Sequence, residues 1–230
     1  MARNRFVTTV VALVGAAVVA ALFHFNRLAT SYNQYIVGNL IGLFWVPMLT
    51  ILFVFREEPD RFGFTLGSSK RVWLAAAVLF LPLFALMLAV SRWQSFQSYY
   101  PLFRQYPEFS GLFARHPGLN AWSAAPWLMA YAEVSYGMYL FCWEFFFRGF
   151  LLFGIARLIG SWSILPQAIA FGIMHAGKPG PEVACSFAAG IILGIVALRA
   201  KSFAPCFVLH WAAAVTFDVL VILAKRGVLF

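Results

Sequence analysis

The chain has 230 residues, of which 63% are hydrophobic and only 11% are charged. A soluble domain is about half apolar and about one quarter charged, so this composition excludes an ordinary soluble protein and indicates a polytopic membrane protein. The formal charge of +9 does not indicate a nucleic-acid partner, because lysine and arginine flank membrane spans and contact anionic lipid headgroups.

Apolar runs of spanning length predict an all-α membrane bundle with about 7–8 transmembrane helices, some of them short or broken. No polar linker divides the chain, so we expect one transmembrane domain over residues 1–230, with N-terminal helices in 1–91. A basic start and a long apolar run give the first span. The simpler predicted spans cover approximately residues 6–23, 35–55, 72–90, 182–198 and 203–223.

Two regions break this simple pattern. Residues 91–120 mix aromatic residues with Arg, Pro and Gly, which is typical of a connection or a short amphipathic helix at the headgroups. Residues 122–158 are too long for one crossing. They form either one tilted, protruding helix or two pieces that break near Gly137, and a short apolar piece, 164–175, follows.

Lysine and arginine counts favour a cytoplasmic N-terminus and a cytoplasmic loop between Arg56 and Arg71. An up-and-down tracing from that start places Glu144 and His175 near opposite membrane faces. We nevertheless expect them to share a site, because short and broken helices are common around functional centres inside membranes.

Ionisable residues within apolar segments are costly, so each is a candidate functional residue. Glu144 and Arg148 are four residues apart and therefore share one helix face. Taken alone, they read as a self-neutralising ion pair, and a single histidine at a helix end reads as an interfacial residue. The full set lies on three successive regions and consists of Glu133, Glu144, Arg148, His175, His210 and Asp218.

Together these residues predict one buried polar pocket with hydrolytic chemistry. A carboxylate and an imidazole can activate a water molecule between them, and a second imidazole can donate to an oxyanion. Such a set can hydrolyse an amide without a nucleophilic Ser or Cys. Nothing in the spacing of Cys142, Cys185 and Cys206 suggests a zinc site or a disulfide framework.

The motifs resemble the CAAX prenyl endopeptidase and bacteriocin-processing (CPBP, Abi) family of intramembrane glutamic proteases, whose pattern is EExxxR, FxxxH and HxxxN. WEFFFRG (143–149), FGIMH (171–175) and HWAAA (210–214) occupy these places. The resemblance covers about the C-terminal half, with a core at 122–225. It implies Glu144, His175 and His210 as catalytic residues, supported by Arg148, Trp143, Phe171 and Asp218.

Two positions depart from the family pattern. Trp143 replaces the first Glu, to which the family usually assigns the role of water-activating base, so either Glu144 has that role or the catalytic carboxylate is missing. Ala214 replaces a small polar residue that helps to bind the oxyanion. Asp218 is an acceptor when ionised and cannot replace that donor, although it can orient His210 or contact a substrate.

The resemblance implies a metal-independent endopeptidase without a cofactor, in a bacterial inner (cell) membrane. It implies a membrane-anchored peptide or protein substrate, processed at a C-terminal tail, a leader or an anchor. Three alternatives stay open: a zinc site built from the Glu and the two His, a catalytically impaired member that binds a membrane peptide or partner, and a small transporter.

Overall fold

The structure is a computed structural model that describes residues 1–67, 70–116 and 120–225. Every regular element in these ranges is helical, which confirms the predicted all-α class. The loop predicted between Arg56 and Arg71 and the one predicted over 91–120 each include residues outside these ranges.

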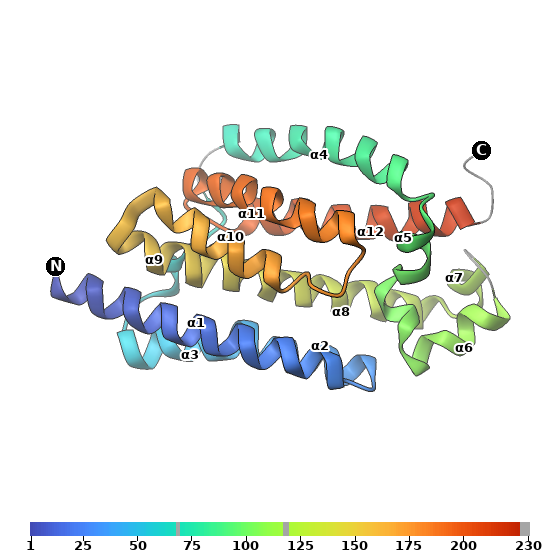
Figure 1. Ribbon diagram of the computed structural model, residues 1–230, viewed down its shortest axis with the longest axis horizontal. Helices are drawn as coiled ribbons and strands as arrows, with labels where there is room; N and C mark the ends of the chain where they lie inside the picture. The colour runs from blue at the N-terminus through green and yellow to red at the C-terminus, as the bar shows by residue number, and fades with distance from the viewer. Residues whose placement is uncertain (68–69, 117–119, 226–230) are drawn as a thin grey trace.

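Six segments of the described chain are long and apolar enough to cross a membrane. Five of them overlap the simpler predicted spans, and the sixth covers both the long region and the short piece that follows it, so the described chain has six such segments where about 7–8 transmembrane helices were predicted. One segment, Pro126–Ile173, has 48 residues and turns back on itself. The protein is thus a polytopic helical bundle with short and broken pieces (Figure 1).

The N-terminal helices form one side of the bundle. Helix α1 covers Ala2–Leu28, and α2 (Tyr32–Leu40) continues through a π-helical turn (Ile41–Trp45), α3 (Val46–Leu49) and a second π-helical turn (Thr50–Phe55). The Ser31 hydroxyl caps α2 by accepting a hydrogen bond from the backbone N–H of Gln34 at 3.2 Å.

Helix α4 (Lys70–Val90) lies on the opposite side of the bundle, with Pro82 inside it (Figure 1). A cluster of short helices follows at one end of the molecule. These are α5 (Gln94–Tyr99), a 3-10 turn (Leu102–Gln105), α6 (Pro107–Arg115) and α7 (Asn120–Ala124). Phe103 and Phe109 from this region are buried against the Tyr32 ring, so the cluster is packed onto the bundle.

The predicted long apolar region forms a helical hairpin. Helix α8 (Pro126–Glu144) runs without a break past Gly137, then continues through a π-helical stretch (Phe145–Leu151) into α9 (Leu152–Ile159). A 3-10 turn (Gly160–Ser163) reverses the chain into α10 (Ile164–Ile173). Gly137 lets α12 approach closely, because a Cβ there would lie 2.5 Å from the Trp211 ring.

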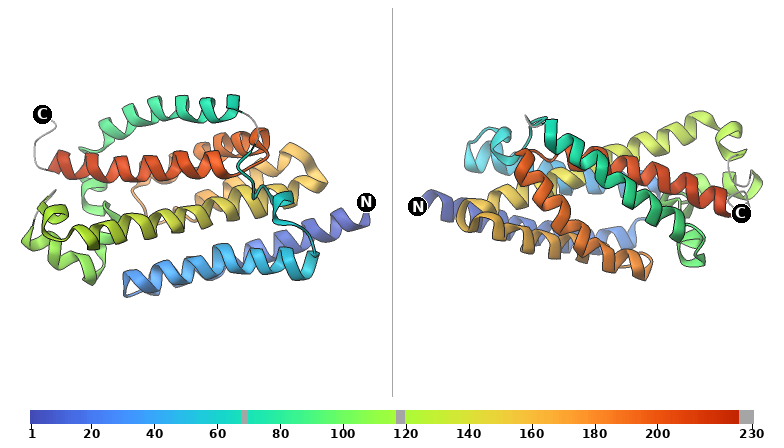
Figure 2. Two further views of the ribbon diagram at one scale, coloured as in Figure 1. Left: turned by 180° about the vertical axis from the view of Figure 1, so that it is seen from behind. Right: turned by 90° about the horizontal axis from the view of Figure 1, so that it is seen from above.

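Helices α11 (Gly180–Ala200) and α12 (Ala204–Lys225) complete the bundle. Helix α12 packs against α4, α8 and α11, and Figure 2 shows it between α4 and α8. The largest core cluster is strongly aromatic and includes the consecutive Phe145, Phe146 and Phe147, all fully buried. This aromatic core surrounds the ionisable residues of the predicted site.

Candidate active site

Glu144 and Arg148 form a fully buried ion pair where α8 passes into the π-helical stretch. Arg148 Nη1 donates to Glu144 Oε1 at 3.3 Å, and both side chains are 0% exposed. The spacing of four residues puts them on one helix face. Short π-helical segments inside α-helices are frequent at functional sites.

His210 of α12 forms a second hydrogen bond with the same carboxylate oxygen. Its Nδ1 lies 2.6 Å from Glu144 Oε1, across 66 residues of sequence. The His210 side chain is 22% exposed, whereas Glu144 is fully enclosed. The imidazole is therefore the accessible end of this buried dyad, while Glu144 Oε2 has no hydrogen-bond partner among the described residues.

His175 lies just beyond the end of α10, and its ring is held in a defined orientation. Its Nδ1 lies 2.8 Å from the backbone carbonyl oxygen of Phe171. A carbonyl only accepts, so Nδ1 carries the proton and Nε2 keeps a free lone pair in the neutral ring. The ring is buried, in an edge contact with Trp143 at a centroid distance of 5.6 Å.

The Phe171 ring joins the parts of the cluster. The guanidinium carbon of Arg148 lies 3.9 Å from its centroid, and the rings of His175 and His210 lie 4.5 and 6.3 Å from it. Both imidazoles and the ion pair thus surround one aromatic side chain. The structure brings together six of the seven predicted site residues: Trp143, Glu144, Arg148, Phe171, His175 and His210.

Trp143 fills the position of the family's first Glu with a large buried ring. It is 3% exposed and packs against Tyr139, Phe147, Phe171 and His175. An indole cannot accept a proton from water, so this side chain shapes the site and does not act as a base.

Asp218 is the predicted residue that lies apart. It is buried on α12, two turns beyond His210, and no described contact joins it to Glu144, His175 or His210. Glu133, on α8, is likewise buried, and neither of its carboxylate oxygens has a partner within the described chain. The eight residues of α-helix from His210 to Asp218 span about 12 Å, so these two side chains are too far apart for direct contact.

The geometry also bears on metal binding. In the described part of the chain, no three His, Cys, Asp or Glu side chains lie close enough together to hold a metal ion. The two imidazoles belong to separate contacts, since His210 Nδ1 faces Glu144 and His175 Nδ1 faces a backbone carbonyl.

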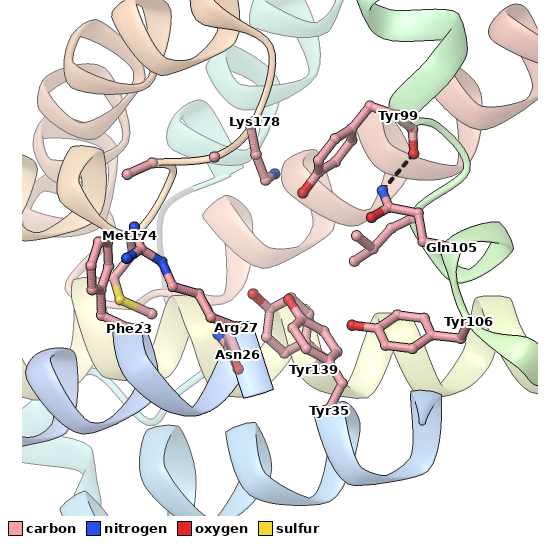
Figure 3. Close-up of a pocket in the computed structure, with 13 residues that line it drawn as sticks. Phe23, Asn26, Arg27, Tyr35, Tyr99, Gln105, Tyr106, Tyr139, Met174 and Lys178 are labelled. Atoms are coloured by element: carbon pink, nitrogen blue, oxygen red, sulfur yellow. Dashed lines mark hydrogen bonds between the residues drawn. The ribbon is translucent and has the colours of Figure 1, made fainter. Parts of the chain in front are cut away.

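A polar hollow of about 210 Å³ lies beside the turn that carries His175 (Figure 3). Met174, Ala176 and Lys178 form one wall of it. Sequence reasoning did not find this hollow, although HAGKPGPE carries the i,i+4 pair Lys178–Glu182, which the structure joins at 2.8 Å. Its other polar lining residues come from α1, α2, α8 and the short-helix region: Asn26, Arg27, Tyr35, Tyr99, Gln105, Tyr106 and Tyr139.

Fold and site together define a polytopic α-helical membrane protein with a buried Glu–Arg–His cluster. The profile of the family described as type II CAAX prenyl endopeptidase Rce1-like matches residues 125–216. The match supports the resemblance to the CAAX protease (CPBP) family that the three motifs indicated, over this segment of the chain. Searches of curated proteins and of solved structures found no significant match. At family level, the activity class is that of a CAAX-type intramembrane endopeptidase.

Proposed function

We propose that the protein hydrolyses a peptide bond of a membrane-associated substrate at the Glu144–His175–His210 cluster, without a metal. The observation that carries the proposal is the 2.6 Å contact between Glu144 and His210. It joins two of the three motif positions, 66 residues apart, in one buried site, and the third motif residue packs on the same Phe171 ring.

Two acceptors are available to activate water. Oε2 of Glu144 has no partner among the described residues, and Nε2 of His175 is unprotonated in the tautomer that the Phe171 carbonyl selects. A water molecule that donates to either acceptor becomes a stronger nucleophile as its proton is withdrawn. Arg148 fixes the orientation of the Glu144 carboxylate through the 3.3 Å contact.

His210 is placed to stabilise the negative charge of the tetrahedral intermediate. When both ring nitrogens carry a proton, Glu144 accepts from Nδ1–H and Nε2–H can donate to the oxyanion. The water oxygen bonds to the carbonyl carbon and its proton passes to the base. That proton then passes to the amide nitrogen, the C–N bond breaks, and a carboxylic acid and an amine leave.

The substrate we propose is a membrane-anchored peptide or protein processed at a C-terminal tail, a leader or an anchor segment. The site lies among spanning helices and an aromatic core, which favours a substrate that reaches it from the lipid phase. The bacterial inner membrane remains our prediction for its location.

A second candidate function is peptide binding without cleavage. Trp143 replaces the first family Glu, and Oε1 of Glu144 already accepts from both Arg148 and His210. Under this function, the cluster stabilises the bundle and the protein retains its membrane partner.

The experiment measures cleavage of a fluorogenic peptide with a farnesylated cysteine near its C-terminus by purified protein in liposomes. Glu144→Gln, His175→Ala and His210→Ala should each lower kcat by about 100-fold or more. Glu133→Gln changes a buried acid of the same helix outside the cluster and should retain activity. Equal activity of all four variants would overturn the proposal, and loss of activity with 1,10-phenanthroline would indicate zinc instead.

A further inference from the structure

A cluster of arginines surrounds the buried Glu57 at one end of the bundle. The first turn of α1, the loop that follows Phe55 and helix α9 meet there (Figure 2). Arg157 of α9 donates from Nη1 to Glu57 Oε1 at 2.9 Å, and its Nη2 lies 2.7 Å from Oε2. Since one guanidinium contacts both carboxylate oxygens, Arg157 alone neutralises the charge of Glu57.

Two further arginines lie close to the same carboxylate. Arg3 Nη2 is 3.0 Å and Arg61 Nη1 is 3.8 Å from Glu57 Oε1, so the cluster of three arginines and one glutamate carries two surplus positive charges. Exposed residues nearby do not remove this surplus, because their acids and arginines are equal in number: Glu58, Asp60, Arg5 and Arg56. The cluster therefore attracts an anion.

The two surplus guanidiniums are accessible and close together. The Arg3 and Arg61 side chains are 65% and 62% exposed, whereas Glu57 lies beneath them at 2%. Their two nitrogens are separated by at most the sum of their distances to Glu57 Oε1, about 7 Å. One phosphate group can accept from both, because a charge-assisted hydrogen bond extends about 2.7–2.9 Å on each side.

The surroundings of the two arginines are typical of the boundary between headgroups and hydrocarbon. Phe6 follows Arg3 by three residues and therefore shares its face of α1. Its exposed ring makes an edge contact with Phe55 at a centroid distance of 6.3 Å. Trp162, in the 3-10 turn after α9, is also exposed, and tryptophan is enriched at the headgroup level. An anion bound here has apolar side chains beside it.

A structural role explains only part of this cluster. Arg3 also lies 3.4 Å from the carbonyl oxygen of Phe55, to which it donates, and thus helps to tie α1 to the loop. Arg61, at 3.8 Å, lies beyond hydrogen-bond distance of Glu57. Exposed ion pairs of this kind contribute little to stability, so the fold alone does not account for a third arginine.

We propose that Arg3 and Arg61 bind the phosphodiester of an anionic bilayer lipid of the phosphatidylglycerol class, whose acyl chain lies along Phe6. A zwitterionic lipid brings an ammonium group next to the surplus positive charge and is therefore disfavoured. The site lies at the end of the bundle, on residues that the proposed hydrolysis does not use. The inference is independent of that hydrolysis.

Binding is measured by native mass spectrometry of the purified full chain in detergent. The probes are phosphatidylglycerol and phosphatidylcholine with the same acyl chains. We expect phosphatidylglycerol to bind about tenfold more tightly, because two exposed arginines supply the preference. Arg3→Gln combined with Arg61→Gln should remove this preference, whereas Arg3→Lys combined with Arg61→Lys should retain most of it, because both charges remain.

Arg5→Gln combined with Arg56→Gln is the matched control, because it removes two exposed cations from the same end of the bundle. Equal affinity of the unsubstituted protein for the two lipids, or a preference that survives the Arg3 and Arg61 double substitution, would overturn the inference. A control variant that loses the preference equally would show a general charge effect and would also overturn it.

Two further measurements keep the test decisive. If thermal midpoints show that the double variant does not fold, the single variant Arg61→Gln takes its place and should weaken phosphatidylglycerol binding by about threefold, because Arg61 makes the longest contact in the cluster. Displacement of the bound lipid by an equal concentration of glycerol 3-phosphate would identify a site for free phosphate and would overturn the assignment to a lipid.

Discussion

The carboxylate of Glu144 accepts hydrogen bonds from Arg148 and from His210 through the same oxygen, at 3.3 and 2.6 Å. Two donors on one oxygen leave the other oxygen without a partner in the described structure. Glu144 at the end of α8 is thereby tied to His210 of α12, so the packing of these two helices depends on one buried charge.

The buried ion pair predicts strongly non-additive substitutions. Glu144→Leu should lower the free energy of unfolding by about 3–5 kcal/mol, because it leaves the fully buried Arg148 without its anion. Adding Arg148→Met should recover part of that loss, because both charges are then absent. Unfolding titrations in mixed detergent micelles measure both. A double variant whose loss equals the sum of the two single losses would contradict the coupling.

Trp143 is predicted to orient His175. Trp143→Phe keeps a ring against the imidazole, whereas Trp143→Ala opens a cavity in the aromatic core and should cost about 3–5 kcal/mol of stability. Both proteins are compared by kcat and thermal midpoint. We expect Trp143→Phe to retain most of the activity. If Trp143→Ala folds and cleaves as fast as the unsubstituted protein, the tryptophan has no positioning role.

Much of the fold was readable from the sequence, because apolar length determines which segments can span a membrane. The Glu144–Arg148 pair was readable as well, since helix geometry alone brings residues four apart together. Which histidine contacts Glu144 could not be predicted from the sequence. Which imidazole reaches it depends on how α12 packs against α8, and that packing is set by features such as the approach of Trp211 to Gly137.

The up-and-down tracing placed Glu144 and His175 at opposite faces, and the hairpin explains why it was wrong. The turn begins at Gly160, whose φ is 58°. Glu144 lies before this glycine and His175 lies after it, at nearly the same number of residues. The two arms of the hairpin therefore bring the two residues level. Helix α10 has only 10 residues, about 15 Å, and therefore ends within the bundle without crossing it.

Gly149 follows Arg148 in the π-helical stretch. We predict that this position must be glycine, because there is no room for a side chain. A Cβ there would lie 2.9 Å from the backbone oxygen of Phe62, which cannot move as a flexible side chain can. Gly149→Ala should therefore displace the segment carrying Arg148 and lower stability by about 1–3 kcal/mol. Gly111→Ala is the control, because a Cβ at Gly111 meets nothing within 4 Å. Equal thermal midpoints for the two variants would contradict this assignment.

Glu57 is a buried carboxylate that ties three segments together outside the membrane spans. Arg3 of α1 lies 3.0 Å from its Oε1, Arg157 of α9 lies 2.7 Å from its Oε2, and Arg61 lies 3.8 Å from Oε1. Glu57→Gln keeps the shape but removes the charge, and should lower the free energy of unfolding by about 2–3 kcal/mol near neutral pH. Glu58→Gln, at the exposed neighbouring acid, is the matched control.

The contribution of Glu57 should also depend on pH with a defined sign. The hydrogen bond from Arg157 is the largest cause that lowers the pKa of Glu57 below its ordinary value of 4.5. A carboxyl with a lowered pKa in the folded state stabilises that state fully above the unfolded pKa and loses this contribution as the pH falls through the folded pKa. The stability difference between the unsubstituted protein and Glu57→Gln should therefore be constant near neutral pH and shrink below about pH 4.5. Unfolding titrations across that range measure it, and a difference that stays the same or grows on acidification would show that the charge of Glu57 does not stabilise the fold.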